Sequence, residues 1–379
     1  MQFKSVPARL FLALFTLLLL VAFGQLNSPP MLRRHPLLHD SHAASSYVSI
    51  KTINEKQEAG SLNIDVGVRV RAIHGVNLPE QKFDSEGWYW LAWGQEVQDL
   101  IERNNIEPHE ILEIVNSVEQ ESSVYSPDGV ISIVRNGRKT YYSSAFYSGK
   151  FFVPNIDLRN SPFDQLILPI IFEVAPRVLG VEANRVYLRP EMNTESDPIA
   201  GEFSGISGFR LLDTSWERAV VTYLSPPDSS SGAQRSFSRA TALFAYFPAF
   251  WPVFVQWIMP LLVVMGIVVL TPSLDGALGD SRLAIPTAAL LTLIFLHLGY
   301  KTSFPETPYL TYLDLLYAYS YCVCIVIYIL FVFSSNAHSR RCRDGAERES
   351  QVRHDRIESI VQVSVLVGYV CVAFFGWHA

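Results

Sequence analysis

The sequence predicts a membrane protein in two parts: an all-β, immunoglobulin-like sandwich domain followed by a bundle of four transmembrane helices. Three observations lead to this architecture. The chain of 379 residues is 49% hydrophobic but only 17% charged, whereas soluble proteins average about 25% charged residues. Its longest apolar runs are concentrated after residue 245. Before them, short apolar segments alternate with polar residues and are separated by turn signals.

The composition also excludes several classes of protein. Thirty basic against thirty-six acidic residues give a net charge of −6, so no basic excess exists to bind phosphates and no nucleic-acid partner is expected. The high apolar content excludes a disordered chain. Four cysteines in a chain this long argue against a secreted module held by disulfides. All four follow the predicted outer domain, at Cys322, Cys324, Cys342 and Cys371.

The N-terminus predicts a secretory signal peptide over residues 1–24. Two basic residues precede the apolar run Leu10–Gly24, which is short for a bilayer span of about 20 residues. Cleavage is expected near Ala22–Gln25, and an uncleaved anchor helix is the alternative. Residues 25–60 are expected to form a mobile lead-in, because their first half is polar and rich in proline and histidine.

Four apolar runs predict a transmembrane domain over residues 244–379. Each run is long enough to cross about 30 Å of hydrocarbon as a helix. Six arginines lie in the connection Ser335–Arg356, so the positive-inside rule places that connection in the cytoplasm. An even number of spans then puts the β-rich domain and the C-terminus outside a plasma or inner membrane, in the extracellular space or periplasm. The runs are Tyr246–Thr271, Leu283–Tyr300, Tyr309–Ser334 and Ile357–Trp377.

Residues 61–243 predict the sandwich domain. Strict alternation of apolar and polar residues predicts half-buried strands, and near-continuous apolar segments predict buried ones. Asn136-Gly137 is a strong hairpin signal. Many short strands separated by turns are typical of a β-sandwich. The expected strands include 66–73, 130–134, 165–174 and 218–224, with one helix at 96–104 and an exposed loop at 225–232.

The segment Pro154–Leu168 contains a recognisable spacing of residues. Two apolar residues follow Pro154 at the second and fourth positions, and a Pro-x-Asp turn comes next. This spacing resembles the signature loop of the pentameric ligand-gated ion channels, the Cys-loop receptor superfamily. Pro154 and Leu168 replace the two signature cysteines, as in bacterial members, and Ser161 replaces the aromatic residue before the proline. The matching residues are Ile156, Leu158, Pro162 and Asp164.

A second segment and the overall order of parts strengthen this resemblance. Phe304–Asp314 resembles the link between the second and third membrane helices of the family, especially in its bacterial form. A signal peptide, a β-rich outer domain and four spans also occur in the order that the family shows. The resemblance covers about residues 60–379. It implies a homopentamer around a central pore, with agonist sites between subunits.

The resemblance makes Leu283–Tyr300 the pore-lining helix, with Pro305 as the anchor of the alignment. Asp280 then occupies the acidic ring at the inner mouth, as in cation-selective members; its alternative role is to cap the following helix. Arg282 takes the neighbouring basic position and could screen Asp280 if it also faced the lumen. The implied pore stripe is Asp280, Ala284, Ala288, Leu291, Phe295, Leu298 or Gly299, and Thr302.

This stripe is unusually apolar. Leu291 and Phe295 are expected to form a hydrophobic constriction, which can stop ions by dewetting. Pro286 is expected to bend the first turns of the helix, and such a bend could bring Thr287 into the lumen instead of Ala288. His297 is expected to face a neighbouring helix. It is either a satisfied buried histidine, the commoner case, or a pH sensor.

The resemblance also implies an interface that couples agonist binding to the pore. Three elements are expected to meet at the membrane face: Val76–Lys82, Asp157–Asp164 and Lys301–Tyr309. Such an interface would bias a pore with two states. The expected coupling residues are Glu80, Pro162, Phe163, Asp164, Pro305 and Glu306.

Aromatic residues are the candidates for an agonist site. The family's site is lined by aromatics, which suit cationic amines, and Leu224–Gln234 would be its capping loop. Because no convincing aromatic cage is visible, an amine agonist is not supported, and the agonist stays an unidentified small molecule or the proton. The alternative is that these residues belong to the sandwich core. They are Tyr125, Tyr187, Trp216 and Tyr223.

The function predicted from these patterns is a pentameric ligand-gated, cation-selective channel subunit. Its expected partners are further copies of itself, membrane lipid, permeating cations and the agonist. The alternative is a non-conducting membrane sensor of the same fold, suggested by the apolar lower pore. No catalytic motif occurs, so no enzyme, cofactor or metal site is expected. One cluster, His35, His39, Asp40 and His42, lies in the lead-in without a rigid frame.

Overall fold

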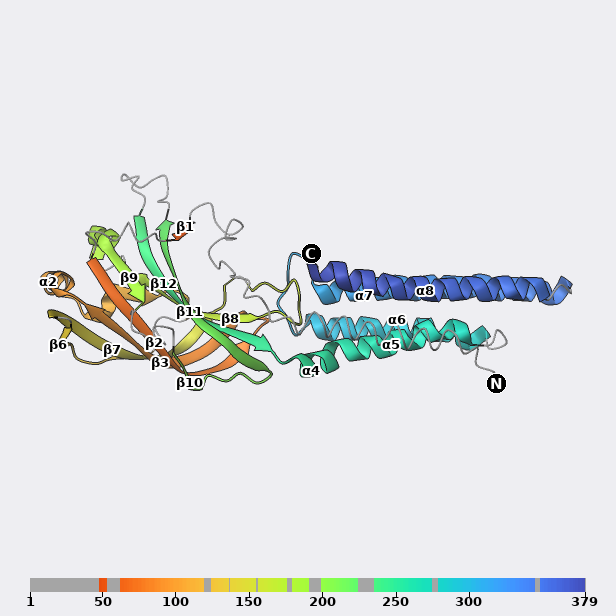
Figure 1. Cartoon of the computed structure of the whole chain (residues 1–379), viewed down its shortest axis with the longest axis horizontal. Coiled ribbons are helices and arrows are strands. Elements are labelled where there is room, and N and C mark those ends of the chain that lie inside the picture. The colour runs from red at the N-terminus through yellow and green to blue at the C-terminus, as the bar shows by residue number, and fades with distance from the viewer. Residues whose placement is uncertain are drawn as a thin grey trace. The chain divides into compact units, whose positions relative to one another are not determined.

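The computed structural model of the chain separates into two compact units (Figure 1). The helical unit contains Phe250–Ala379 together with the loop Asp157–Asp164, and the sheet unit contains the described residues before position 250 outside that loop. The structure describes residues 48–52, 62–118, 124–135, 137–154, 156–175, 179–190, 199–223, 235–274, 279–344 and 348–378. The predicted signal peptide and the loop 225–232 lie outside these residues.

Two sheets form the sheet unit within the described residues. The first has the strand order β1-β11-β12-β8-β4, and the second has the order β10-β2-β3-β7-β5, with β6 also paired to β7 and β9 also paired to β2. The first sheet consists of β1 (Val48–Thr52), β11 (Phe209–Tyr223), β12 (Arg235–Pro248), β8 (Leu166–Val174) and β4 (Leu112–Ile114). The second consists of β10 (Ile199–Phe203), β2 (Leu62–Asn77), β3 (Lys82–Trp93), β7 (Arg138–Phe152), β5 (Val124–Pro127), β6 (Ile131–Arg135) and β9 (Val186–Pro190).

One hydrophobic core joins the two sheets. Alternate residues of β2 are buried, and they belong to the same cluster as buried residues of β8 and β12, which is the pattern of face-to-face packing. This confirms a sandwich-like, sheet-rich domain before the membrane helices. Helix α2 (Gln95–Asn104), at the predicted position, buries Val97, Leu100 and Ile101 at helical spacing. Two short 3₁₀ helices, η3 (Pro108–Ile111) and η4 (Gly180–Arg185), complete the unit.

Two boundaries differ in detail from the predicted ones. Strand β1 lies within the expected lead-in 25–60 and pairs with β11. Strand β12 continues to Pro248, past the expected end of the domain at 243 and into the first expected span. The cause is that apolar residues at the end of a buried strand have the same hydropathy as the start of a membrane helix: Tyr246 is fully buried, and its hydroxyl donates to the Ser204 carbonyl at 2.7 Å. The hairpin between β6 and β7 turns at Gly137, whose φ of 75° suits glycine.

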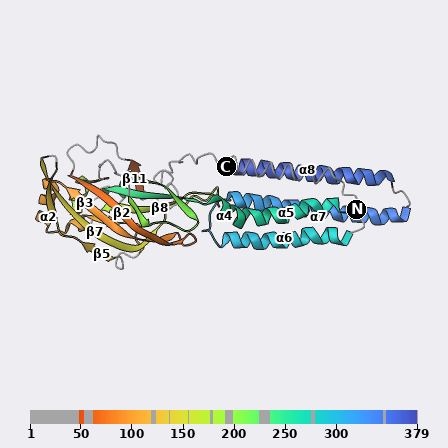
Figure 2. The same ribbon diagram turned by 60° about the horizontal axis from the view of Figure 1, so that its bottom comes forward.

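Within the described residues, the helical unit contains four helices that are long and apolar enough to cross a membrane, which makes the chain a multi-pass membrane protein. The spans are Phe250–Ser273, Asp280–Lys301, Tyr312–Phe333 and Ile360–Trp377. The first comprises α4 (Phe250–Val253), a π-helical turn η5 (Phe254–Ile258), α5 (Met259–Leu270) and η6 (Thr271–Ser273). The others lie in α6 (Gly279–Lys301), α7 (Tyr312–Asp344) and α8 (Arg348–His378). Figure 2 shows these helices running lengthwise alongside one another.

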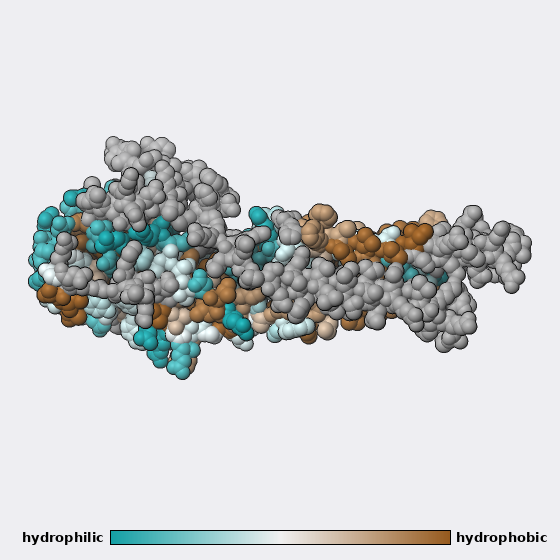
Figure 3. Space-filling model, in the orientation of Figure 1, coloured by the Kyte–Doolittle hydropathy of each residue, from teal (hydrophilic) through white to brown (hydrophobic). Residues whose placement is uncertain are grey.

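Helix α6 packs against both α5 and α7, and α8 packs against α7. Helices α7 and α8 lie close together at Gly368, where a Cβ atom would overlap the Tyr319 hydroxyl. That hydroxyl donates to the Val365 carbonyl at 3.0 Å. Many large apolar side chains of the described helices are exposed, and Figure 3 shows hydrophobic residues on part of their surface, as contact with lipid requires.

The connection expected at Ser335–Arg356 is helical in its described part. Helix α7 continues to Asp344 and α8 begins at Arg348. Hydropathy marks where the apolar residues stop, but arginine and glutamate are good helix formers. The backbone helix therefore extends beyond the apolar run at both sides of this connection.

Candidate functional site

The loop Asp157–Asp164 connects strands β7 and β8 but belongs to the helical unit. It lies on the link between α6 and α7. The backbone N–H of Leu158 donates to the Tyr309 hydroxyl at 2.9 Å, and the N–H of Tyr312 donates to the Arg159 carbonyl at 2.7 Å. The Arg159 guanidinium lies 5.7 Å from the centre of the Tyr309 ring. The loop Asp157–Asp164 and the α6–α7 link, which the resemblance implied would meet, are therefore joined by hydrogen bonds and a cation–π contact.

The tip of this loop is held by aromatic packing. Phe163 is 7% exposed, and its ring centre lies 5.6 Å from that of Phe250 and 6.3 Å from that of Trp377. Pro162 is buried beside it and follows a cis peptide bond. Phe163 thus packs the loop against the first and last helices of the bundle, because large aromatic rings contribute most of the burial at such contacts.

The other expected coupling residues have different surroundings. Asp164 is half-buried at the end of the loop, Pro305 is half-buried in the α6–α7 link, and Glu306 is exposed there. Glu80 belongs to the sheet unit, in the turn between β2 and β3. Its carboxylate accepts from the Lys82 ammonium at 3.2 Å, so this pair is a local one within the turn.

Helix α7 begins with a capping box that the sequence analysis did not include. The Thr311 hydroxyl accepts the N–H of Asp314 at 3.2 Å, and the Asp314 carboxylate accepts the N–H of Thr311 at 3.0 Å. The signal was present in the sequence as Thr-x-x-Asp before an apolar run. This motif places a carboxylate at the N-terminus of α7, where the helix dipole favours negative charge.

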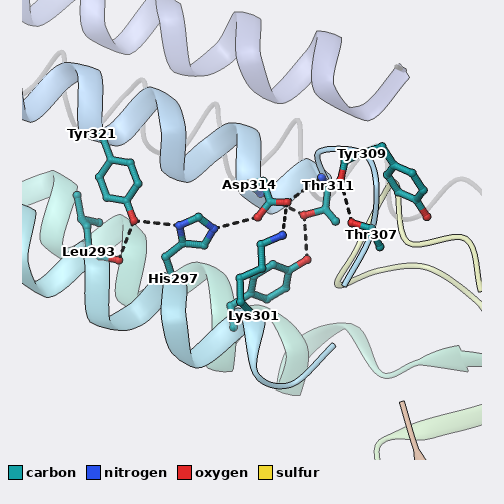
Figure 4. A network of polar contacts seen from close by, with 9 residues as sticks. Leu293, His297, Lys301, Thr307, Tyr309, Thr311, Asp314 and Tyr321 are labelled. Atoms are coloured by element: carbon teal, nitrogen blue, oxygen red, sulfur yellow. Dashed lines mark hydrogen bonds and ion pairs between the residues drawn. The ribbon is translucent and has the colours of Figure 1, made fainter. Parts of the chain in front are cut away.

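Asp314 is also the centre of a polar network between α6 and α7 (Figure 4). Its side chain is 3% exposed and receives two side-chain donors from α6: His297 Nε2 at 2.9 Å and Lys301 Nζ at 2.6 Å. His297 Nδ1 lies 3.0 Å from the Tyr321 hydroxyl, and its ring stacks on Tyr317 at 4.7 Å. The expectation that His297 faces a neighbouring helix is confirmed, and polar groups engage both of its ring nitrogens.

The residues of the expected pore stripe lie together on one exposed side of α6, which we call the α6 stripe. Leu291, Phe295 and Leu298 are 56%, 65% and 56% exposed, whereas Leu293 and Tyr300 face the bundle core. The α6 stripe consists of Asp280, Ala284, Ala288, Leu291, Phe295, Leu298 and Thr302, all of them exposed in the single chain.

Pro286 lies inside α6 without ending the helix. Thr287 is exposed next to the α6 stripe, and its hydroxyl donates to the Leu283 carbonyl at 3.0 Å. The Thr292 hydroxyl donates to the Ala288 carbonyl at 2.9 Å in the same way. Because both hydroxyl hydrogens bond to the helix backbone, neither is left to bind water, so the exposed side of α6 is even more apolar than its sequence indicates.

Arg282 does not lie on the α6 stripe. Its side chain is buried in the helical unit, where the guanidinium donates to the Pro272 carbonyl at 3.2 Å and lies 4.6 Å above the Phe331 ring. Asp280 is exposed. The two charges that neighbour each other in sequence therefore point to different sides of the helix, and Arg282 does not stand beside Asp280 on the exposed side.

The structure does not gather the four candidate aromatics into one site. Trp216 packs on Phe172 of the sandwich core at 6.3 Å, as the core alternative predicted. Strands β5 and β9, which carry Tyr125 and Tyr187, lie at opposite edges of the second sheet. The side chain of Tyr125 and the capping loop Leu224–Gln234 lie outside the described residues.

Tyr223 belongs to a buried ion-pair cluster. Its hydroxyl donates to Glu173 at 2.9 Å, and Arg239 pairs with the same carboxylate at 2.6 Å. Burial, with the Glu173 charge as a second cause, raises the pKa of Tyr223 to about 12. The phenol therefore keeps its proton as a donor to Glu173 at neutral pH. This cluster joins strands β8, β11 and β12 and is a sufficient structural reason for a tyrosine at this position.

Within the described residues, no three histidine, cysteine, aspartate or glutamate side chains are grouped to hold a metal ion. The sequence cluster of His35, His39, Asp40 and His42 lies outside the described residues. No protein-family model matches this chain, and no curated protein matches it. The candidate site is therefore defined by its own geometry within the helical unit: the loop Asp157–Asp164 on the α6–α7 link, a polar network beside that link, and an exposed apolar stripe on α6.

Proposed function

We propose that the chain is a subunit of a homopentameric ligand-gated ion channel with an immunoglobulin-like outer domain. The observation that carries this proposal is the loop Asp157–Asp164. It runs between two strands of the sheet unit, yet it is bonded to the link that ends α6. A ligand that shifts β7 or β8 would move this loop, and the hydrogen bonds from Leu158 and to Arg159 would transmit the movement to α6.

The exposed side of α6 supports a role in lining a pore. Large apolar side chains in a ring of copies create a constriction that water leaves, and such a constriction stops ions without a plug. Leu291 and Phe295 are the largest side chains of the α6 stripe. Asp280, at the first turn of α6, would supply a ring of negative charge. Because Arg282 is turned into the bundle, that ring would attract cations without a neighbouring screen.

Two apolar surfaces on the sheet unit support assembly into a ring. Ile131, Ile133 and Val134 of β6 are exposed at one edge of the second sheet (Figure 3), and Ile199 and Phe203 of β10 are exposed at the other. Exposed apolar surfaces mark interaction sites. Two different surfaces at opposite edges favour head-to-tail contacts between copies, and contacts of that kind close into a ring when the rotation between successive copies is a whole fraction of a turn.

Reconstitution tests the proposal. Purified protein in nanodiscs is expected to form five-fold particles, and in bilayers it is expected to conduct in response to acid or to a member of an amine, amino-acid and divalent-ion panel. Leu291→Ser is expected to wet the constriction and raise resting conductance. Ile325→Ser, on the exposed side of α7 and 48% exposed, is the matched control and should leave conductance unchanged. Particles of another symmetry, or silence of both wild type and Leu291→Ser, contradict the proposal.

A non-conducting sensor of the same architecture is the second candidate. It is favoured by the apolar character of α6, where the hydroxyls of Thr287 and Thr292 bond to the backbone and little remains to hydrate an ion. The same recordings separate the two candidates. If five-fold particles bind an agonist but the Leu291→Ser variant carries no current, the sensor is the better description.

A further inference from the structure

His297 lies between a carboxylate and a phenol that both come from α7 (Figure 4). Its Nε2 atom is 2.9 Å from Asp314 Oδ1, and its Nδ1 atom is 3.0 Å from the Tyr321 hydroxyl. A carboxylate accepts hydrogen bonds and does not donate them, so Nε2 carries a hydrogen. The remaining variable is Nδ1, which either accepts a hydrogen from Tyr321 or carries one itself.

The carboxylate is held in place without help from His297. Asp314 accepts the Thr311 N–H at 3.0 Å and the Lys301 ammonium at 2.6 Å, and it stands at the N-terminus of α7. These contacts keep it charged and oriented. Lys301 and Asp314 together carry no net charge. A proton on His297 therefore changes the cluster from neutral to singly positive.

Tyr321 lets the network accept that proton without moving its heavy atoms. The Tyr321 oxygen lies 3.0 Å from His297 Nδ1 and 3.3 Å from the Leu293 carbonyl. With neutral histidine, the phenol donates its single hydrogen to Nδ1. With protonated histidine, Nδ1 donates to the phenol oxygen, and the phenol hydrogen turns to the Leu293 carbonyl. Each hydrogen therefore has an acceptor in both protonation states, as partly buried polar groups require.

We propose that His297 is a proton-binding site that strengthens the contact between α6 and α7. A protonated ring adds a charge-assisted bond to Asp314, and that bond exists only while the two helices keep this arrangement. By linkage, acid therefore favours this arrangement over any in which α6 has moved away from α7. The titratable groups that face His297 are Lys301 on its own helix and Asp314, Tyr317 and Tyr321 on α7.

The site is near the end of its span, since His297 lies one turn before Lys301, where α6 ends. A quarter of its side chain is exposed, which leaves a route for a proton. Because α6 is the helix proposed to line the pore, a proton at this site would bias the pore. That consequence rests on the proposed function, whereas proton uptake at His297 does not depend on it.

Thermal melting of the full chain in nanodiscs tests proton binding without any current. Between about pH 8 and pH 5, where histidine titrates, the melting temperature of wild type minus that of His297→Gln should rise as the pH falls. Tyr321→Phe and Asp314→Asn should move the midpoint of this rise to lower pH, because each removes a partner of the protonated ring. Lys301→Gln should move it to higher pH, because it removes a competing positive charge. Tyr328→Phe, on an exposed part of α7, should match wild type.

The pattern of shifts separates a proton site from a merely structural contact. Removing a merely structural contact lowers the melting temperature by the same amount at every pH. A difference in melting temperature between wild type and His297→Gln that does not depend on pH therefore overturns the proposal. If His297→Gln does not fold, the opposite midpoint shifts of Tyr321→Phe and Lys301→Gln decide the question, and shifts of one sign overturn it. Currents form a second arm: a silent channel contradicts the proposed function and leaves the melting result in force.

Discussion

Single buried polar residues fix how the strands of the sheet unit meet. Asn116 is 6% exposed, and its amide nitrogen donates to the carbonyls of Phe152 and Pro169, each at 2.9 Å. Its amide oxygen accepts the Ile171 N–H at 3.0 Å. One side chain thus ties the end of β7, in one sheet, to β8, in the other. Three backbone groups therefore bond to this one side chain. An apolar side chain of similar volume would leave all three without this partner.

Asn116→Leu is expected to lower the free energy of unfolding by about 2–4 kcal/mol, because each buried polar group left without a partner costs about 1–3 kcal/mol. Denaturation followed by tryptophan fluorescence measures the change. Asn104→Ala serves as a control, since it removes a single hydrogen bond at the C-terminus of α2, to the Leu100 carbonyl. A loss of less than about 0.5 kcal/mol in Asn116→Leu, the range of surface substitutions, would contradict the role assigned to it.

His109 predicts a pH dependence of the sheet unit. Its ring nitrogens lie 3.1 Å from the Tyr89 hydroxyl and 2.9 Å from the Ser143 hydroxyl. Burial lowers the pKa of His109, and the nearby Asp128 charge only partly opposes this. Above the unfolded value of 6.5 the ring is neutral in both states and has no effect. As the pH falls below that value, the unfolded chain takes up the proton more readily, so stability is lost as the pH falls toward the folded pKa.

His109→Gln should therefore reduce the acid destabilisation of the protein. The measurement is the melting temperature against pH, compared with wild type at each pH. The sign is opposite to that expected for His297, where acid strengthens a contact, so the two variants act as controls for each other. An unchanged acid slope in His109→Gln would show that this ring does not titrate in the pH range tested.

At the scale of elements, α6 separates two neighbouring charges. Asp280 is exposed, whereas Arg282 is buried against Pro272 and Phe331. In the proposed channel, reversal potentials under a NaCl gradient should follow the cation. Asp280→Asn should reduce that preference, because the ring of charge faces the lumen. Arg282→Gln should change it much less. An anion-following wild type, or an Arg282→Gln effect as large as that of Asp280→Asn, contradicts this arrangement.

At the scale of the whole molecule, the two apolar edges of the second sheet predict how copies assemble. Ile133→Glu on β6 and Phe203→Glu on β10 should each prevent ring formation, because a charge buried in an apolar contact is costly. Each variant keeps one intact edge. A mixture of the two should therefore form pairs through the remaining good contact, but no closed rings. Light scattering of detergent-solubilised protein measures the size, and intact rings in either single variant contradict a head-to-tail contact at these edges.

The predicted order of parts agreed with the structure because hydropathy and alternation are strong local signals. Both the sandwich-like domain and the four spans follow from them. The boundary near Tyr246 did not, since an apolar strand end and a helix start have the same composition. The strand β1 was also missed, because its pairing with β11 joins residues about 170 positions apart and leaves no local signal.

The candidate site also contains residues that the sequence could indicate and residues whose role only the structure shows. The family resemblance, combined with helical spacing, named Pro162, Phe163 and the α6 stripe as candidates, because these candidates follow from short motifs within one segment. The burial of Arg282, the separation of Tyr125 from Tyr187 and the role of Asp314 depended on which elements lie next to each other. For Asp314 the capping motif was readable, but its histidine and lysine partners come from another helix.

The sequence by itself determined that this chain is a β-rich domain joined to four membrane spans, because burial in a sheet and burial in lipid each impose a period or a length on the residues. Only the tertiary structure decided that the loop Asp157–Asp164 belongs to the helical unit and that His297 stands between Asp314 and Tyr321. Such contacts join residues from different elements. Their energy depends on distance and direction in space, which no local pattern in the chain records.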